Sequence, residues 1–126
     1  MNPELSVIVV TLNEEENLDR VLARITRDSG LEALEVLVVD GGSRDRTEEI
    51  AARYARVIRA RRGRASQLEA GLREVRGKIV CFCHGDTLLP EGYGRMILQA
   101  VKPGVVGGAF QPVSEPGHWL LKGLSW

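Results

Sequence analysis

The sequence has no excess of charge of either sign, because 17 Lys and Arg residues balance 17 Asp and Glu residues among its 126 residues. Proteins that bind nucleic acid in bulk usually present a basic face, so this balance argues against such a partner. No apolar run approaches the roughly 20 residues of a membrane-spanning helix. The N-terminus also lacks the basic start and apolar core of a signal peptide. A hydrophobic content of 44% fits one small domain with its own core.

Cysteine is scarce, and the two residues present, Cys81 and Cys83, stand two apart in one apolar run. Strand residues at that spacing point the same way, so a disulfide between them would be strained. Their spacing is also tighter than that of structural zinc sites, and the sequence has no second cluster. We therefore interpret both as small buried apolar residues in a reducing, cytoplasmic protein. His118 receives no role.

Three nucleotide-binding and hydrolase motifs are missing. The sequence has no G-x-G-x-x-G after its first strand, and its Gly41-Gly42-Ser43 follows the second strand, which disfavours a dinucleotide-binding domain. The absence of G-x-x-x-x-G-K-[ST] excludes a P-loop NTPase on pattern. No nucleophile elbow supports a Ser/His/Asp triad.

Apolar strand patterns alternate with helical ones along the chain, which predicts a doubly wound α/β domain with a mostly parallel sheet. Strands are expected at 5–10, 35–39, 57–58, 79–83 and 105–110, and helices at 18–25, 47–54, 65–75 and 91–101. The segment 118–126 is apolar at near-helical spacing.

Helix ends and faces follow from single residues. Asn13 is expected to cap the first helix, with Glu14 to Glu16 in its first turn. Asp45 and Glu48 resemble a capping box for the second helix. The third helix is expected to pack through one apolar face, formed by Ala65, Leu68, Leu72 and Val75.

Polar residues follow three of the predicted strands. Thr11 and Asn13 end the first, Asp40 the second and Asp86 the fourth, so parallel strands would gather them at one edge of the sheet. Asp86 beside Gly85 suits a metal held against phosphate oxygens, although an Asp that merely caps a turn is the alternative.

The second strand end offers a further binding loop. Asp40 would bind a ribose or a base N–H, and Gly42 and Ser43 would bring backbone N–H groups close to a ligand. The alternative is a plain turn between strand and helix.

The basic cluster Arg59–Arg64 precedes the third helix. A planar guanidinium matches a diphosphate in a bidentate way, and a helix N-terminus also favours phosphate. Arg64 is the candidate because it stands next to the helix start; a solvated loop is the alternative.

Three segments together resemble the family 2 nucleotide-sugar glycosyltransferases, which have the GT-A fold. They are residues 5–18 (LSVIVVTLNEEENL), 35–47 (EVLVVDGGSRDRT) and 82–90 (FCHGDTLLP), the last resembling the D-x-D region. The residues 63–65 and the His-x-Asp-Thr sequence look closest to a short bacterial subgroup.

The resemblance implies an inverting transferase that takes a sugar from a nucleoside-diphosphate sugar to an unknown acceptor. Thr11, Asn13 and Glu14 would lie near the nucleobase and ribose, and Asp40 would bind one of them. Asp86 would hold Mg²⁺ or Mn²⁺ against the diphosphate.

The sequence departs from the family pattern in several places. His84 stands where the first Asp of D-x-D usually stands; as a metal ligand it would favour Mn²⁺ over Mg²⁺. Leu68 and Glu69 stand where many relatives have Arg and Asn, and no residue matches the acidic base. The single domain, 1–126, therefore looks truncated, with 113–126 as the start of an incomplete acceptor-side region.

Two alternatives remain from the sequence. The chain could be a nucleotide-binding module without catalysis, or a self-associating fragment that buries its apolar tail, 119–126, on another copy. The same tail leaves peripheral membrane contact open.

Overall fold

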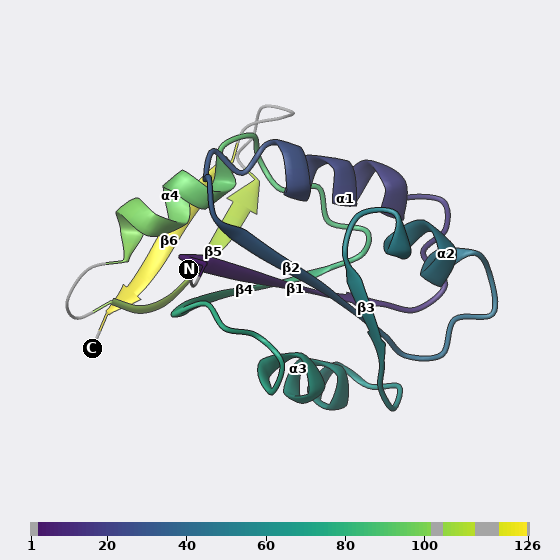
Figure 1. Cartoon of the computed structure of the whole chain (residues 1–126). Coiled ribbons are helices and arrows are strands. Elements are labelled where there is room, and N and C mark those ends of the chain that lie inside the picture. The colour runs from purple at the N-terminus through teal and green to yellow at the C-terminus, as the bar shows by residue number, and fades with distance from the viewer. Residues whose placement is uncertain (1–2, 102–104, 113–118, 126) are drawn as a thin grey trace.

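The computed structural model describes residues 3–101, 105–112 and 119–125, with side chains described from 3 to 101. Figure 1 shows strands alternating with helices along most of the chain, as the sequence pattern predicts. The elements are β1 (Leu5–Thr11), α1 (Leu18–Arg27), β2 (Leu34–Asp40), α2 (Thr47–Ala52), β3 (Arg56–Arg59), α3 (Arg64–Leu72), β4 (Ile79–His84), α4 (Tyr93–Ala100), β5 (Val105–Pro112) and β6 (Trp119–Ser125).

Four parallel strands form the central sheet in the order β3-β2-β1-β4. Thr11 is in register with Asp40, and Val10 with His84, so β1, β2 and β4 end at the same edge. The strand order reverses between β1 and β4, and open α/β sheets bind ligands outside the carboxyl ends at such a switch point. The predicted gathering of strand ends is confirmed.

Helices cover both faces of this sheet, which confirms the doubly wound fold. α1 and α2 lie on one side and α3 on the other (Figure 1). The first face joins the apolar side of α1 to Val7, Val9 and Val38, and the second contains Ile8 and Val39. Full burial of an aliphatic side chain contributes about 1.5–3 kcal/mol, so β1, buried along its whole length, is the centre of the core.

The α3 helix packs only in part through the predicted face, because Leu68 and Val75 contact the core whereas Ala65 is exposed. It ends at Leu72, which is 48% exposed, so it does not continue to Val75. Its buried residues are Gln67 and Gly71. A Cβ on Gly71 would lie 2.8 Å from Cγ2 of Ile8, so the glycine allows the helix to approach the sheet closely. The buried positions of the helix are a polar and a small residue, which the apolar pattern does not mark.

Both predicted helix caps are also wrong. α1 starts at Leu18, and Asn13 lies well before it in a left-handed conformation with φ 54°. Asp45 accepts a hydrogen bond from the Thr47 N–H, but Glu48 pairs with Arg59 and does not return to Asp45. Asn13 and Asp45, which the sequence pattern predicts to be helix caps, instead form hydrogen bonds between the loop after β1 and the loop after β2.

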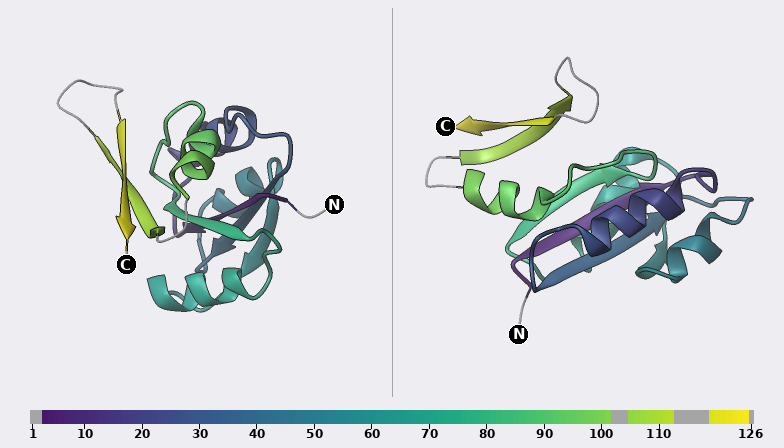
Figure 2. Two further views of the ribbon diagram at one scale, coloured as in Figure 1. Left: turned by 90° about the vertical axis from the view of Figure 1, so that its left-hand side faces the viewer. Right: turned by 90° about the horizontal axis from the view of Figure 1, so that it is seen from above.

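The remaining strands correct two further expectations. β4 is an edge strand rather than a fully buried one, with Val80 37% exposed. β5 is a strand as predicted, but it pairs antiparallel with β6, so residues 119–125 are extended rather than helical. Figure 2 shows this hairpin beside α4 and outside the four-stranded sheet.

Two other expectations concern the cysteines and the ends of the chain. Cys81 and Cys83 are free thiols, as expected, and burial raises the pKa of both. Residues 113–118, where the predicted acceptor-side region would begin, and His118 lie outside the described residues. No described helix has the length and apolar character that crossing a membrane requires.

Candidate functional site at the carboxyl ends of the strands

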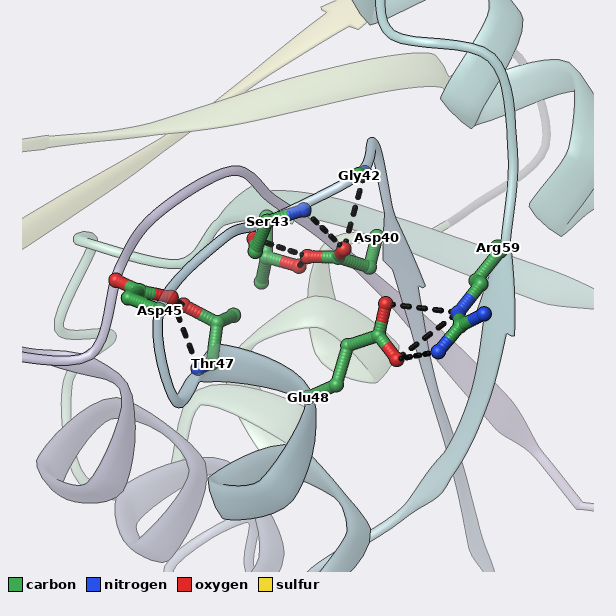
Figure 3. Close-up of polar contacts among 8 residues, drawn as sticks. Asp40, Gly42, Ser43, Asp45, Thr47, Glu48 and Arg59 are labelled. Atoms are coloured by element: carbon green, nitrogen blue, oxygen red, sulfur yellow. Dashed lines mark hydrogen bonds and ion pairs between the residues drawn. The ribbon is translucent and has the colours of Figure 1, made fainter.

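Asp40, at the end of β2, is completely buried and organises the loop that follows it. Its Oδ1 accepts hydrogen bonds from the hydroxyls of Thr11 (2.7 Å) and Ser43 (2.6 Å). Its Oδ2 accepts from the backbone N–H groups of Gly42 (3.0 Å) and Ser43 (2.7 Å). Figure 3 shows the loop curled around this carboxylate. The strand ends of β1 and β2 are therefore joined through one charged group.

Two opposing effects act on the pKa of Asp40. Burial alone would raise it, but the hydrogen bonds from Ser43, Thr11 and Gly42 outweigh burial and hold the pKa below its usual value. The ionised carboxylate is therefore the form that the loop requires.

The loop after β1 is bound to the loop after β2. The Asn13 N–H donates to the Ser43 hydroxyl (2.8 Å), and the Asn13 side-chain oxygen accepts from the Arg44 N–H (2.8 Å). The Glu14 N–H donates to the Thr47 hydroxyl at 2.8 Å. The left-handed backbone of Asn13 turns the chain to make these bonds. Thr47, which the sequence analysis did not single out, is fully buried and also donates to Asp45 (Figure 3).

The end of β4 lies against the first loop. The Gly85 N–H donates to the carbonyl of Val10 at 3.0 Å, which carries the β4 ladder into the turn. A Cβ on Gly85 would stand 3.0 Å from both Thr11 and Glu14, so only a glycine fits without displacing them. Asp86, the next residue, is exposed, and His84 before it is partly buried. The edge therefore brings Thr11, Glu14 and Asp86 to the same turn.

Negative charge accumulates where these loops meet. Partial burial raises the pKa of Glu14, and the charge of Asp86 raises it further, while the nearby His84 acts in the opposite direction. Glu14 and Asp86 thus repel each other, and a cation would relieve the repulsion.

The donor set fits a metal that is shared with a ligand. Among residues 3–101, no three His, Cys, Asp or Glu side chains are gathered closely enough to hold a metal ion alone. Mg²⁺ is usually held through one or two carboxylates together with substrate phosphates. The exposed Asp86, with His84 two residues before it, is compatible with that mode of binding.

Gln67 ties the start of α3 to the same edge, and sequence analysis missed it. Its Nε2 donates to the carbonyls of Thr11 (3.0 Å) and Val39 (2.8 Å), while its Oε1 accepts from the Gly63 N–H (3.2 Å). Arg64, the predicted diphosphate ligand, is the first residue of this helix and is exposed. The four-residue spacing of Gln67 and Gly71, which places both on one helical face, was the available signal.

A depression of about 670 Å³ lies at the other edge of the sheet, beside the amino end of β2. Four of its five charged lining residues are paired in two bridges, Arg56 with Glu74 (2.8 Å) and Arg76 with Glu35 (3.4 Å). The predicted site residues lie instead at the edge where the carboxyl ends of the strands meet.

The model of Glycosyl transferase family 2 matches residues 6–123. The chain is 34% identical over 128 residues to dolichol-phosphate mannosyltransferase of Pyrococcus furiosus, covering 92% of the chain and 36% of that protein.

Solved structures give the same likeness. A mannosyltransferase from Pyrobaculum calidifontis, solved in complex with GDP-Man and Mn²⁺, has a TM-score of 0.67 at 28% identity, covering 83% of the chain and 34% of that protein. Glucosyl-3-phosphoglycerate synthase from Mycobacterium tuberculosis, solved with Mn²⁺, UDP and glucosyl-3-phosphoglycerate, has a TM-score of 0.60 at 29% identity, covering 71% and 36%. The chain thus spans about a third of the length of each of these proteins.

Proposed function

The chain belongs to glycosyl transferase family 2, and we propose that it is the donor-binding domain, 1–126, of an inverting glycosyltransferase. The donor is a nucleoside-diphosphate sugar, the class to which the GDP-Man of the Pyrobaculum enzyme belongs. The observation that carries the proposal is the meeting of β1, β2 and β4 at a switch point, with an exposed Asp86 beside loops held rigid by Asp40.

The base and ribose are assigned to the two joined loops. Asn13, Ser43 and Gly42 stand on the loop rim, and Gly42 is exposed with φ 99°, where nothing would meet a Cβ. Open space beside a glycine lets a ligand approach the backbone. Asp40 supports these loops and does not contact the ligand itself, because it already accepts four hydrogen bonds from the protein. Thr11 and Glu14 complete the wall on the β1 side.

The diphosphate is assigned to the space between Asp86 and the start of α3. Asp86 and His84 would hold Mg²⁺ or Mn²⁺, which when bound acts as a Lewis acid on the diphosphate. Arg64 and the free N–H groups of the first turn of α3 add positive charge on the other side. Together they stabilise the charge that the nucleoside diphosphate gains as it leaves.

Inversion requires the acceptor hydroxyl to attack the anomeric carbon from the face opposite the leaving diphosphate. The proposal assigns no catalytic base and no acceptor to residues of this chain. The family membership favours an enzyme over a nucleotide-binding module without catalysis. Self-association or membrane contact through 119–126 and a cytoplasmic setting stay predictions.

A thermal-shift panel tests the donor site: UDP, GDP, TDP and CDP, each with and without Mn²⁺. A ligand at about 100 times its dissociation constant adds roughly 2.7 kcal/mol of stability. We expect one nucleotide to raise the melting temperature in a metal-dependent way, and Asp86→Ala to abolish that shift.

Glu91→Ala is the matched control. Glu91 is an exposed carboxylate next to Gly92, whose N–H donates to the Asp28 carbonyl at the far end of α1. The Glu91→Ala protein should show the same nucleotide-dependent rise in melting temperature as the wild type. A wild-type protein that responds to none of the four nucleotides, or an Asp86→Ala protein that responds fully, would contradict the assignment.

A further inference from the structure

Gln67 is a buried polar side chain that the donor site described so far does not use. It is 5% exposed and is the fourth residue of α3. Both of its amide hydrogens are directed at backbone carbonyls, one at the end of β1 and one at the end of β2. A buried polar group is stable only when it is hydrogen-bonded. This carboxamide therefore depends on the strand ends for its acceptors, and it links the two strand ends to α3.

The third bond of Gln67 fixes how the chain enters α3. Its Oε1 accepts from the N–H of Gly63, the residue before the helix. Gly63 has φ 140°, a conformation that other residues rarely adopt. Gly41 lies against the same carboxamide, and a Cβ there would stand 2.9 Å from Oε1. The two glycines and Gln67 form one tight joint between the helix start and the sheet edge.

We propose that Gln67 is a positioning residue for diphosphate recognition. By holding Gly63 and the first turn of α3 on the ends of β1 and β2, it places Arg64 and the helix N-terminus beside the diphosphate. The inference rests on the proposed function and adds the residue that sets the geometry of its phosphate side. Gln67 itself touches backbone only, so it acts through Arg64 and the helix.

The chemistry of the joint requires an amide. Methionine has a similar length but donates no hydrogen bond. Glutamate has the same shape, yet its ionised form would face two carbonyl oxygens with negative charge and no donor. Substitution by either should release the first turn of α3 while leaving Asn13, Ser43 and the base side of the site in place.

The experiment compares two probes on three proteins in the presence of Mn²⁺. The probes are the nucleoside diphosphate that the wild type binds best among UDP, GDP, TDP and CDP, and the corresponding nucleoside. We expect Gln67→Met to weaken diphosphate binding about tenfold, the equivalent of one or two net hydrogen bonds. Nucleoside affinity should stay within about twofold of the wild type, as should both affinities of the control Gln99→Met, at an exposed glutamine of α4.

A double-mutant cycle separates positioning from general damage. Arg64→Ala should weaken diphosphate binding in the wild type and have little effect in Gln67→Met, because the displaced guanidinium no longer meets the ligand. Additive losses, an equal loss of nucleoside and diphosphate, or an unchanged diphosphate affinity would each overturn the inference. A wild type that binds none of the nucleotides overturns the proposed function first, and the inference with it.

Gln67→Glu decides the question if Gln67→Met does not fold. A protonated carboxyl group can donate one hydrogen bond, whereas the ionised form donates none. The compared quantity is the ratio of the diphosphate affinity of Gln67→Glu to that of Gln99→Glu at the same pH. We expect this ratio to rise as the pH is lowered from 8 to 5. The same ratio at both pH values would overturn the positioning role.

Discussion

Asp40 and Asp86 lie at two strand ends of the same sheet edge but have opposite environments. Asp40 is the last residue of β2 and Asp86 comes two residues after the end of β4, and both strands pair parallel with β1. Asp40 is fully buried and accepts four hydrogen bonds. Asp86 is exposed, and its contact with the Thr87 hydroxyl is long, at 3.4 Å. Topology thus brings a carboxylate to the edge without deciding what it does there.

The residues that follow each carboxylate account for the difference. After Asp40, Gly42 and Ser43 turn their N–H groups back toward it, and Thr11 reaches it from the neighbouring strand. After Asp86, the Thr87 N–H donates to the His84 carbonyl instead, and the Asp86 residue is exposed. One strand end encloses its carboxylate in a loop, and the other leaves its carboxylate exposed, where the proposed metal site requires it.

Replacing Asp40 should have the largest effect on stability. Asp40→Asn puts an NH₂ group or an uncharged oxygen opposite four donors whose hydrogen bonds are buried or partly buried. An unsatisfied buried donor costs about 1–3 kcal/mol, so we expect the free energy of unfolding to fall by about 3 kcal/mol or more. Urea unfolding followed by circular dichroism measures this. A loss below about 1 kcal/mol would mean that the loop does not depend on the carboxylate.

Acid should remove the same contribution without a mutation. The folded pKa of Asp40 lies below its usual value, because its hydrogen bonds outweigh its burial. Its contribution is therefore complete above the pKa of an unfolded Asp, about 3.9, and is lost as the pH falls through the lower folded pKa. We expect wild-type stability to fall steeply below about pH 4 and that of Asp40→Asn to fall less.

Urea midpoints at pH 7, 5, 4 and 3 make this comparison. Some acid sensitivity should remain in Asp40→Asn, because hydrogen bonds from Arg76 and Ser6 overcome the effect of burial and also lower the pKa of Glu35. Parallel curves for the two proteins would contradict the account of Asp40.

Replacing Asp86 should have the smallest effect on stability. Exposed side chains away from special features usually contribute within about 0.5 kcal/mol, so Asp86→Ala should unfold at nearly the wild-type urea midpoint. The same variant should lose metal-dependent nucleotide binding. A large loss of stability in Asp86→Ala would remove the distinction between the two carboxylates.

Sequence reasoning found the four strands of the central sheet, their direction and the residues at their ends, but not β6. This worked because each of β1 and β2 contains a continuous apolar run, at 7–10 and 36–39, and parallel strands must end at one edge. It did not find that Asp40 would be enclosed by its own loop. The sequence of a carboxylate beside two glycines is the same whether the carboxylate binds its own loop or a ligand.

Two of the errors concern residues whose partners are far away in the sequence. Asn13 reads as a helix cap, yet it bonds to Ser43 and Arg44, about 30 positions later. Gln67 bonds to Thr11, 56 positions earlier. Local patterns describe contacts with near neighbours, so a polar residue that joins two loops is assigned to the nearest helix end instead.

The bonds between the two loops have a consequence for engineering. Asn13 and Glu14 depend on Ser43 and Thr47 for their backbone partners, and Arg44 depends on Asn13. Transplanting residues 12–16 alone from a relative, for example to test their proposed contact with the base, would leave residues 43–47 with mismatched hydrogen-bond partners. Residues 12–16 and 43–47 share these hydrogen bonds, so the two segments have to be exchanged together.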